Sequence, residues 1–165
     1  MKLALHLAFA LLMTAMPSNG RAADVLDAEA QRVAARFVKL AGSEDNAVAL
    51  ALALHHGVPV QIVAAGDDDD ALPDAITVET PTGPMSWHDV RISLLHAQDV
   101  LLRAGMTRAT PAALQAALVG GEVDSPLQGR IVVRGVLQMR VEGLSWVDIA
   151  RVTSPSAPQP AFLGR

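Results

Sequence analysis

Residues 86–104 read Ser-Trp-His-Asp-Val-Arg-Ile-Ser-Leu-Leu-His-Ala-Gln-Asp-Val-Leu-Leu-Arg-Ala and carry the clearest helical pattern in the chain. Apolar residues recur there every three or four positions, which is typical of a helix with one face turned to a core. Ser86 is a suitable N-cap, and Gly105 is expected to end the helix. The predicted apolar face comprises Trp87, Val90, Leu94, Ala97, Leu101 and Ala104, widened by Leu95 and Leu102.

Five further helices are predicted around this one. Residues 43–57 begin at Ser43 and hold a body, residues 47–54, that is apolar on every face, as in a buried helix. Its alternation of Leu and Ala also permits a strand, but Ala disfavours strands, so a helix is preferred. The others span residues 24–41, 110–121 and 135–142, and a short stretch from Ser145. The first of them has an apolar stripe of Leu26, Ala30, Val33, Phe37 and Leu40 and stops at Gly42.

Two short segments alternate in polarity and are rich in β-branched residues, which predicts strands. They are residues 58–64, where Pro59 limits the strand to an edge or a start, and residues 76–80. The simplest arrangement is a hairpin with a long acidic loop between them. Residues 122–134 remain ambiguous, with a short strand suggested at Ile131–Val133. The fold class is therefore α+β, a helix-rich single small domain with a short β-hairpin.

The first 22 residues have the three parts of a cleaved secretory signal. Lys2 supplies the basic start, an apolar run extends to Met16, and Gly20 and Ala22 are small residues before a cleavage site. Cleavage after Ala23 is an alternative. A membrane anchor would need roughly 20 apolar residues, and this run is shorter and ends in helix breakers. We therefore expect a periplasmic or secreted protein with no stable membrane insertion.

The remainder is expected to be one soluble domain over residues 23–153 and a disordered, proline-rich tail over residues 154–165. The chain has no Cys, which excludes disulfides and thiolate chemistry. Its formal net charge is −4, and loss of the leader, with its basic Lys2 and Arg21, makes the remainder more acidic. An acidic surface opposes binding to nucleic acid or to anionic membranes. Aromatic residues are only 3 % of the chain, so platforms for sugars or single-stranded nucleic acid are not expected.

One short motif occurs twice. Residues 85–90 read Met-Ser-Trp-His-Asp-Val and residues 144–149 read Leu-Ser-Trp-Val-Asp-Ile. In each copy the Ser can cap the amide three residues on, and the Asp at that position can reach back, in a variant of the capping box. The motif therefore predicts two helices that start alike, with Trp87 and Trp146 packed in or beside the core.

The same segments carry a resemblance. Thr80-Pro-Thr-Gly-Pro-Met-Ser-Trp87, followed by residues 111–121 and by Gly135-Val-Leu-Gln-Met-Arg-Val-Glu-Gly-Leu-Ser-Trp-Val-Asp-Ile-Ala150, resembles a pattern of small exported bacterial proteins of uncharacterised function. The pattern reads Pro-Thr-Gly-Pro-Met-(Gly/Ser)-Trp, then Gly-Val-Leu-Gln-Met-Arg-x-x-Gly-(Met/Leu)-(Gly/Ser)-Trp-x-x-Ile-Ala. It covers the chain from about Phe37 to Ala150. The chain departs from it at Ser86, His88, Ser145 and Val147, where that group tends to have Gly. The resemblance implies export and a fold, and it implies no activity and no site residues.

Residues 139–151 also look like the first half of a helix-turn-helix. A DNA reader would next need a basic recognition helix, but Thr153-Ser-Pro-Ser-Ala-Pro158 cannot form one. The acidic charge and the predicted leader also oppose DNA binding.

The histidines and the acidic run are the candidate metal ligands of the chain. His55 and His56 are adjacent and diverge on a helix, and His88 and His96 lie about two turns apart on another. Surface histidines are the preferred interpretation, because no metal-binding spacing occurs. The run from Asp67 to Asp70 lacks the Gly and Glu of an EF-hand, since Leu72 and Val78 take those places, so weak calcium binding stays open.

No nucleophile elbow, phosphate-binding loop or dinucleotide fingerprint occurs, and a Ser–His–Asp triad stays open because its members need not be close in sequence. We assign no catalytic, metal-binding or cofactor-binding residue and no cofactor. The preferred function is a non-catalytic, exported protein that binds an unknown protein partner or has a structural role in the envelope. One alternative is a small metal-dependent or hydrolytic periplasmic enzyme using His88, His96 and the acidic loop. Another is a truncated nucleic-acid binder of helix-turn-helix type.

Overall fold

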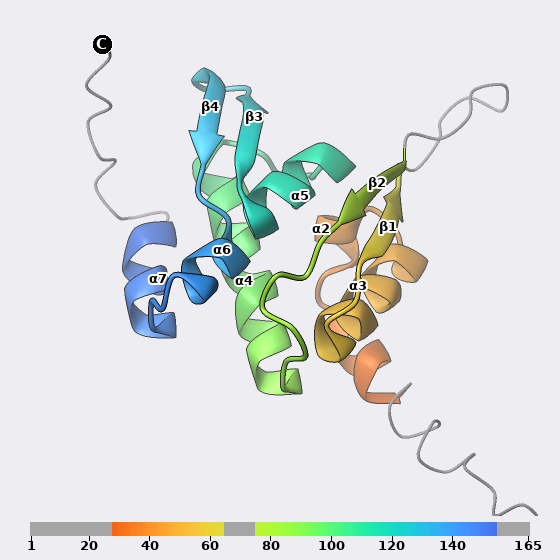
Figure 1. Ribbon diagram of the computed structural model, residues 1–165. Helices are drawn as coiled ribbons and strands as arrows, with labels where there is room; N and C mark the ends of the chain where they lie inside the picture. Colours follow the sequence, from red (N-terminus) through yellow and green to blue (C-terminus); the bar gives the residue numbers. More distant parts are fainter. Residues whose placement is uncertain (1–27, 65–74, 155–165) are drawn as a thin grey trace, which may run out of the picture.

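The computed structural model describes residues 28–64 and 75–154. The predicted leader, residues 1–22, the acidic run Asp67 to Asp70 and all but the first residue of the predicted tail lie outside these residues. Helices and two small antiparallel hairpins share one apolar core, so the α+β class predicted from the sequence is confirmed (Figure 1). No helix in the described ranges is both long enough and apolar enough to cross a bilayer.

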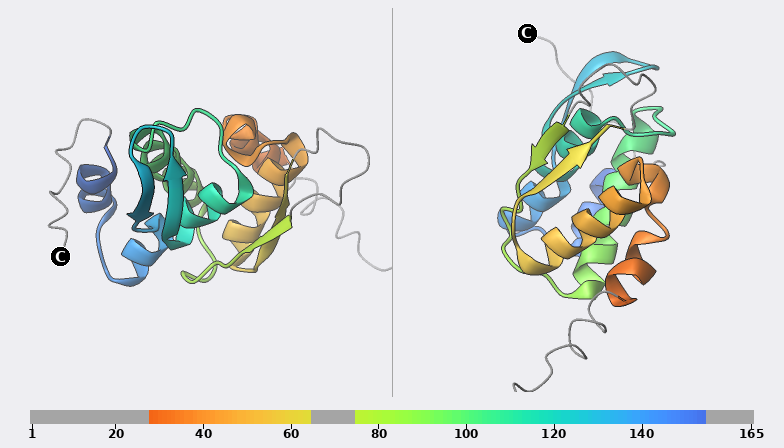
Figure 2. Two further views of the ribbon diagram at one scale, coloured as in Figure 1. Left: turned by 90° about the horizontal axis from the view of Figure 1, so that it is seen from above. Right: turned by 90° about the vertical axis from the view of Figure 1, so that its right-hand side faces the viewer.

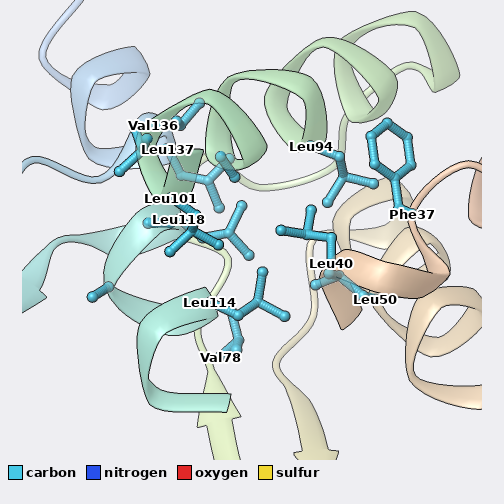
Figure 3. Close-up of a cluster of buried hydrophobic side chains, with 14 of the residues drawn as sticks. Phe37, Leu40, Leu50, Val78, Leu94, Leu101, Leu114, Leu118, Val136 and Leu137 are labelled. Atoms are coloured by element: carbon cyan, nitrogen blue, oxygen red, sulfur yellow. The ribbon is translucent and has the colours of Figure 1, made fainter. Parts of the chain in front are cut away.

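Helix α4, Trp87–Arg103, lies at the centre and confirms the predicted helix. Helix α5, Pro111–Val119, packs against it, and leucines of both helices meet in the core (Figure 3). The predicted widening of the apolar face of α4 is wrong, because Leu95 and Leu102 are 43 % and 45 % exposed. Each follows a fully buried residue, Leu94 or Leu101, and one helical step of about 100° turns its side chain outward.

The first predicted helix is broken in the structure. Residues 28–34 are helical, a turn occupies residues 35–37, and α2, Val38–Ala41, follows. In the turn the amide of Phe37 bonds to the carbonyl of Ala34, three residues back, instead of four. The expected apolar stripe is nevertheless buried in its described part, with Phe37 1 % exposed.

Helix α3, Glu44–His56, begins where it was predicted to, and the side chain of Ser43 caps it by accepting from the amide of Asn46. Its buried Asn46 side chain donates to the carbonyls of Ala41 and Val63, at 3.0 and 2.7 Å, and accepts from the amide of Val63 at 3.3 Å. These bonds hold α3 against the first strand, because a buried amide side chain is stable only when its polar atoms have partners.

The first hairpin pairs β1, Val60–Val63, with β2, Ala75–Val78, so the predicted hairpin is confirmed with shorter strands. Ile62 and Val78 turn into the core and are 1 % and 0 % exposed. Pro59 lies just before β1, where its missing amide hydrogen leaves no strand bond unmade.

A second hairpin occupies the region that the sequence left ambiguous. Strand β3, Gly121–Ser125, pairs with β4, Gly129–Val133, so the suggested strand at Ile131–Val133 is part of β4. The Ser125 hydroxyl accepts from the amides of Leu127 and Gln128 and donates to the carbonyl of Ala104 at 2.7 Å. The turn is therefore fixed by a bond to the end of α4.

Two short helices complete the described chain, α6, Val136–Val141, and α7, Trp146–Thr153, both where helices were predicted. Helix α7 packs on α4 and α6, and viewed from above it lies at the opposite end of the molecule from α3 (Figure 2). Within the same half, α6 packs on α5 and α4.

The end of α3 is tied to the Pro-Thr-Gly-Pro turn before α4. His55 Nδ1 lies 2.8 Å from the carbonyl oxygen of Met85, and the amide of Met85 donates to the carbonyl of His55 at 3.2 Å. Gly57 has a φ of +69°, and a Cβ placed on it would lie 2.4 Å from backbone atoms of Gly83 and Pro84. Only a glycine allows the two segments to approach this closely.

Candidate functional site

The two copies of the Ser-Trp-x-Asp motif meet across a small polar cleft of about 280 Å³. One wall is the Pro-Thr-Gly-Pro turn with the start of α4, and the other is the end of α6 with the start of α7. We call it the polar cleft, and its lining residues are Pro81, Thr82, Pro84, Met85, Ser86, Asp89, Arg140, Val141 and Trp146.

Asp89 joins the two motifs. The Ser86 hydroxyl donates to its carboxylate at 2.7 Å and accepts from its amide at 3.1 Å. The indole Nε1 of Trp146 donates to the other carboxylate oxygen at 2.7 Å, linking residues 57 positions apart. The hydrogen bond from Ser86 lowers the pKa of Asp89 most, and Trp146, His88 and Arg140 lower it further. Asp89 is therefore an anion at neutral pH and a poor general base.

The second motif repeats the cap without the bond to an indole. The Ser145 hydroxyl donates to the Asp148 carboxylate at 2.6 Å and accepts from the amide of Asp148 at 3.2 Å. In both copies the Asp reaches back to the Ser hydroxyl, so the predicted capping is confirmed.

The guanidinium of Arg140 lies over the indole ring of Trp146. The Arg140 guanidinium lies 4.5 Å from the centre of the indole, and its Nη1 donates to the carbonyl of Leu144 at 2.5 Å. The polar groups of the cleft thus bind one another, and the geometry is that of a joint between α4 and α7. Trp87 is also half-buried beside the core, stacked on His55 with 4.1 Å between ring centres, so both indoles lie where the motif predicted.

The histidines do not gather. His88 is exposed and its Nδ1 lies 3.3 Å from Arg91, whereas His96 is half-buried against Trp146, so a surface position is wrong for His96. It is also wrong for His55, which is half-buried on Trp87. His56 is exposed, but its ring meets that of His55 edge-on at 5.0 Å, so these two rings do not diverge. In the described part of the chain no three His, Asp or Glu side chains are placed to share a metal ion.

One hydroxyl–histidine–carboxylate group does form, but with the wrong geometry for a triad. Thr153 Oγ1 lies 3.2 Å and Asp99 Oδ2 lies 3.6 Å from the same nitrogen of His96, Nδ1. A catalytic histidine uses one ring nitrogen for the nucleophile and the other for the carboxylate. Thr153 is also 2 % exposed, and its hydroxyl donates to the carbonyl of Ile149, so this group is structural.

A second depression is apolar and has a volume of about 270 Å³. It lies between β4 and the C-terminal ends of α4 and α7, with α6 contributing Met139, and we call it the β4 groove. Its lining residues are Val100, Arg103, Ala104, Gln128, Ile131, Val132, Val133, Arg134, Met139, Val152 and Thr153.

The β4 groove runs along a strand edge. Side chains of a strand alternate between two faces, so three successive lining residues, Ile131 to Val133, place the groove beside the strand and not over one face. Within the described residues β4 pairs only with β3, which leaves its outer edge open. Val132 is 64 % exposed there, and Val152 across the groove is 43 % exposed.

The charged residues that line the β4 groove are both cationic. Arg134 forms an ion pair with Glu142. Arg103 donates through Nη1 to the carbonyl of Val152, and forms no ion pair with any residue in the described ranges. The sequence interpretation missed these residues, although the apolar run at 131–133 between Arg130 and Arg134 is typical of an edge strand guarded by charges.

The polar cleft and the β4 groove offer surfaces for binding. A search of protein-family models, curated proteins and solved structures finds no match to this chain.

Proposed function

We propose that this protein is an exported, non-catalytic binding module whose β4 groove holds an extended, apolar segment of a partner protein. The observation that carries the proposal is the open edge of β4 beside an apolar depression. An extended peptide that adds to a sheet edge gains backbone hydrogen bonds from the strand, and its side chains fill adjacent pockets. The groove supplies both elements in one place.

The size of the groove limits what it holds. A volume of about 270 Å³ is at the small end of the range for ligand sites. A groove of this size has room for a few apolar side chains of a short segment and not for a large folded surface. Interfaces this small are typical of weak, transient complexes.

Export is the part of the proposal that rests on the sequence. The basic start, the apolar run and the small residues at Gly20 and Ala22 have the composition of a cleaved signal. Together with the apolar groove, this gives a periplasmic or secreted protein that acts on other exported chains.

A labelled probe peptide tests the binding proposal. The neutral probe is acetyl-Thr-Val-Thr-Ile-Thr-amide, and its binding is followed by fluorescence anisotropy and by NMR shifts of the protein amides. We expect saturable binding, with the largest amide shifts in β4. Val132→Asp should remove the binding, because a carboxylate would stand in the apolar groove.

Val147→Asp is the matched control. Val147 is 60 % exposed, close to the 64 % of Val132, but it lies on α7 outside the groove lining. We expect this variant to bind the neutral probe like the unchanged protein. Equal binding by both variants, or no binding by the unchanged protein, would refute the proposed function.

A further inference from the structure

The geometry points to a partner segment that carries an acidic side chain next to its apolar residues, with the carboxylate held by Arg103. This inference rests on the proposed function and adds the charge of the ligand. It starts from the difference between the two cations in the β4 groove. Arg134 already has the carboxylate of Glu142, whereas Arg103 has only the carbonyl of Val152 among the described residues.

Arg103 is held in place before any ligand arrives. It is only partly exposed at the end of α4, and its bond to Val152 fixes one side of the planar guanidinium against α7. A guanidinium carries five N–H donors, so donors remain for a carboxylate after this bond is made. Fixing the cation in advance lowers the entropy that binding must remove.

The surroundings of Arg103 strengthen its attraction for an anion. The groove lining is otherwise mainly aliphatic and contains no Asp or Glu. A charge–charge contact is stronger beside apolar surface than in bulk water, because the local dielectric constant is lower. Hydrogen bonds to charged partners are also about twice as strong as those between neutral groups.

A side-chain carboxylate fits this position better than the free end of a peptide. Arg103 belongs to α4, which forms a different wall of the groove from β4. The backbone of a segment paired with β4 follows the line of that strand, and its side chains are the groups that project across the groove. The chain as a whole is acidic, with a net charge of −4, so an acidic partner must be recognised locally by Arg103.

The experiment compares the neutral probe with versions in which one Thr at a time is replaced by Glu or by Lys. We expect one Glu version to bind the unchanged protein at least about 5-fold more tightly than the neutral probe, and its Lys counterpart more weakly. In Arg103→Gln the Glu preference should disappear, while the neutral probe still binds. Arg134→Gln, the matched control, should keep the preference, because Arg134 is already paired with Glu142.

The outcomes separate this inference from the proposed function. If the neutral probe binds but Glu and Lys versions bind alike, the inference is wrong and the proposed function stands. A further probe has the neutral sequence with a free C-terminal carboxylate in place of the amide. If its affinity rises more than that of any Glu version, the inference is also overturned. The Lys and Glu probes act on the unchanged protein, so the test remains decisive even if Arg103→Gln unfolds.

Discussion

At the scale of single residues, Asp89 makes one contact that is local in sequence and one that is distant. The sequence motif predicts its cap with Ser86, because a cap depends only on residues three apart. The bond from Trp146 to Asp89 spans 57 positions and depends on how α7 packs on α4. No local pattern contains that information, so the joint was visible only in the structure.

The contribution of the indole bond can be measured with Asp89→Asn. The amide retains an acceptor but loses the charge that Ser86 and Trp146 bind, so we expect a loss of about 1 kcal/mol in the free energy of unfolding. Asp148→Asn is the control, because Asp148 has the same cap and its other carboxylate oxygen binds the exposed Arg151 at 2.9 Å instead of an indole. Exposed ion pairs contribute little, so denaturant unfolding should show a smaller loss for the control, and equal losses would mean that the Trp146 bond contributes no more than this exposed pair.

The difference in unfolding free energy between the unchanged protein and Asp89→Asn should depend on pH with a defined sign. The folded-state pKa of Asp89 lies below the ordinary 3.8, chiefly through the bond from Ser86. A lowered pKa stabilises the fold above the unfolded value, and this contribution is lost as the pH falls through the folded-state pKa. The unfolding free energies of the unchanged protein and Asp89→Asn should therefore differ at pH 7 and converge below pH 3.8. A gap that stays constant down to acid pH would contradict a role for the charge.

At the scale of helices and strands, the sequence predicted where most of the helices begin, but it did not predict every strand. Ser43, Ser86, Thr110 and Ser145 cap four helices, each at the residue where its helix was predicted to begin, because capping is a local property. Strand β3 was missed because its residues, Gly-Glu-Val-Asp-Ser, do not favour strands apart from Val123. Its turn is held instead by the bond from Ser125 to Ala104, a tertiary contact.

The contact between α3 and the turn before α4 makes a specific prediction for Gly57. In Gly57→Ala the new methyl group would overlap the backbone of Gly83 and Pro84, so we expect a loss of ~3 kcal/mol or more in the free energy of unfolding. Gly42→Ala is the matched control, since Gly42 has a φ of +88° but nothing within 4 Å of the added carbon. Its loss should stay near 1 kcal/mol in thermal or denaturant unfolding. Similar losses at both glycines would mean that close approach at Gly57 is unimportant.

At the scale of the whole molecule, the β4 groove could not be predicted from segments of the sequence taken one at a time. Its walls come from α4, β4, α6 and α7, and each segment alone looks like an ordinary helix or strand. The class of fold and the buried stripes follow from local periodicity. The groove follows from how these segments pack, which periodicity does not specify.

The proposed export makes a prediction about the chain with residues 1–22 present. We expect the protein expressed with residues 1–22 in a bacterial host to reach the periplasm and to lose those residues, measured by intact mass after cell fractionation. Ala22→Tyr should slow cleavage, because the peptidase site needs a small residue there, whereas Ala28→Tyr, at an exposed position beyond the site, should be processed normally. An uncleaved chain in the cytosol would contradict export.

The placement of the two indoles makes the domain unusually convenient for spectroscopy. The chain contains no Tyr and two Trp, and these report two contacts at the same end of α4: the ring of Trp87 stacks on His55 of α3, and the indole of Trp146 in α7 donates to Asp89. Emission from Trp87→Phe and from Trp146→Phe would therefore record the α7–α4 contact and the α3–α4 contact, respectively, during heating. Coincident melting curves would show a single cooperative unit, and separated curves would identify which contact loosens first.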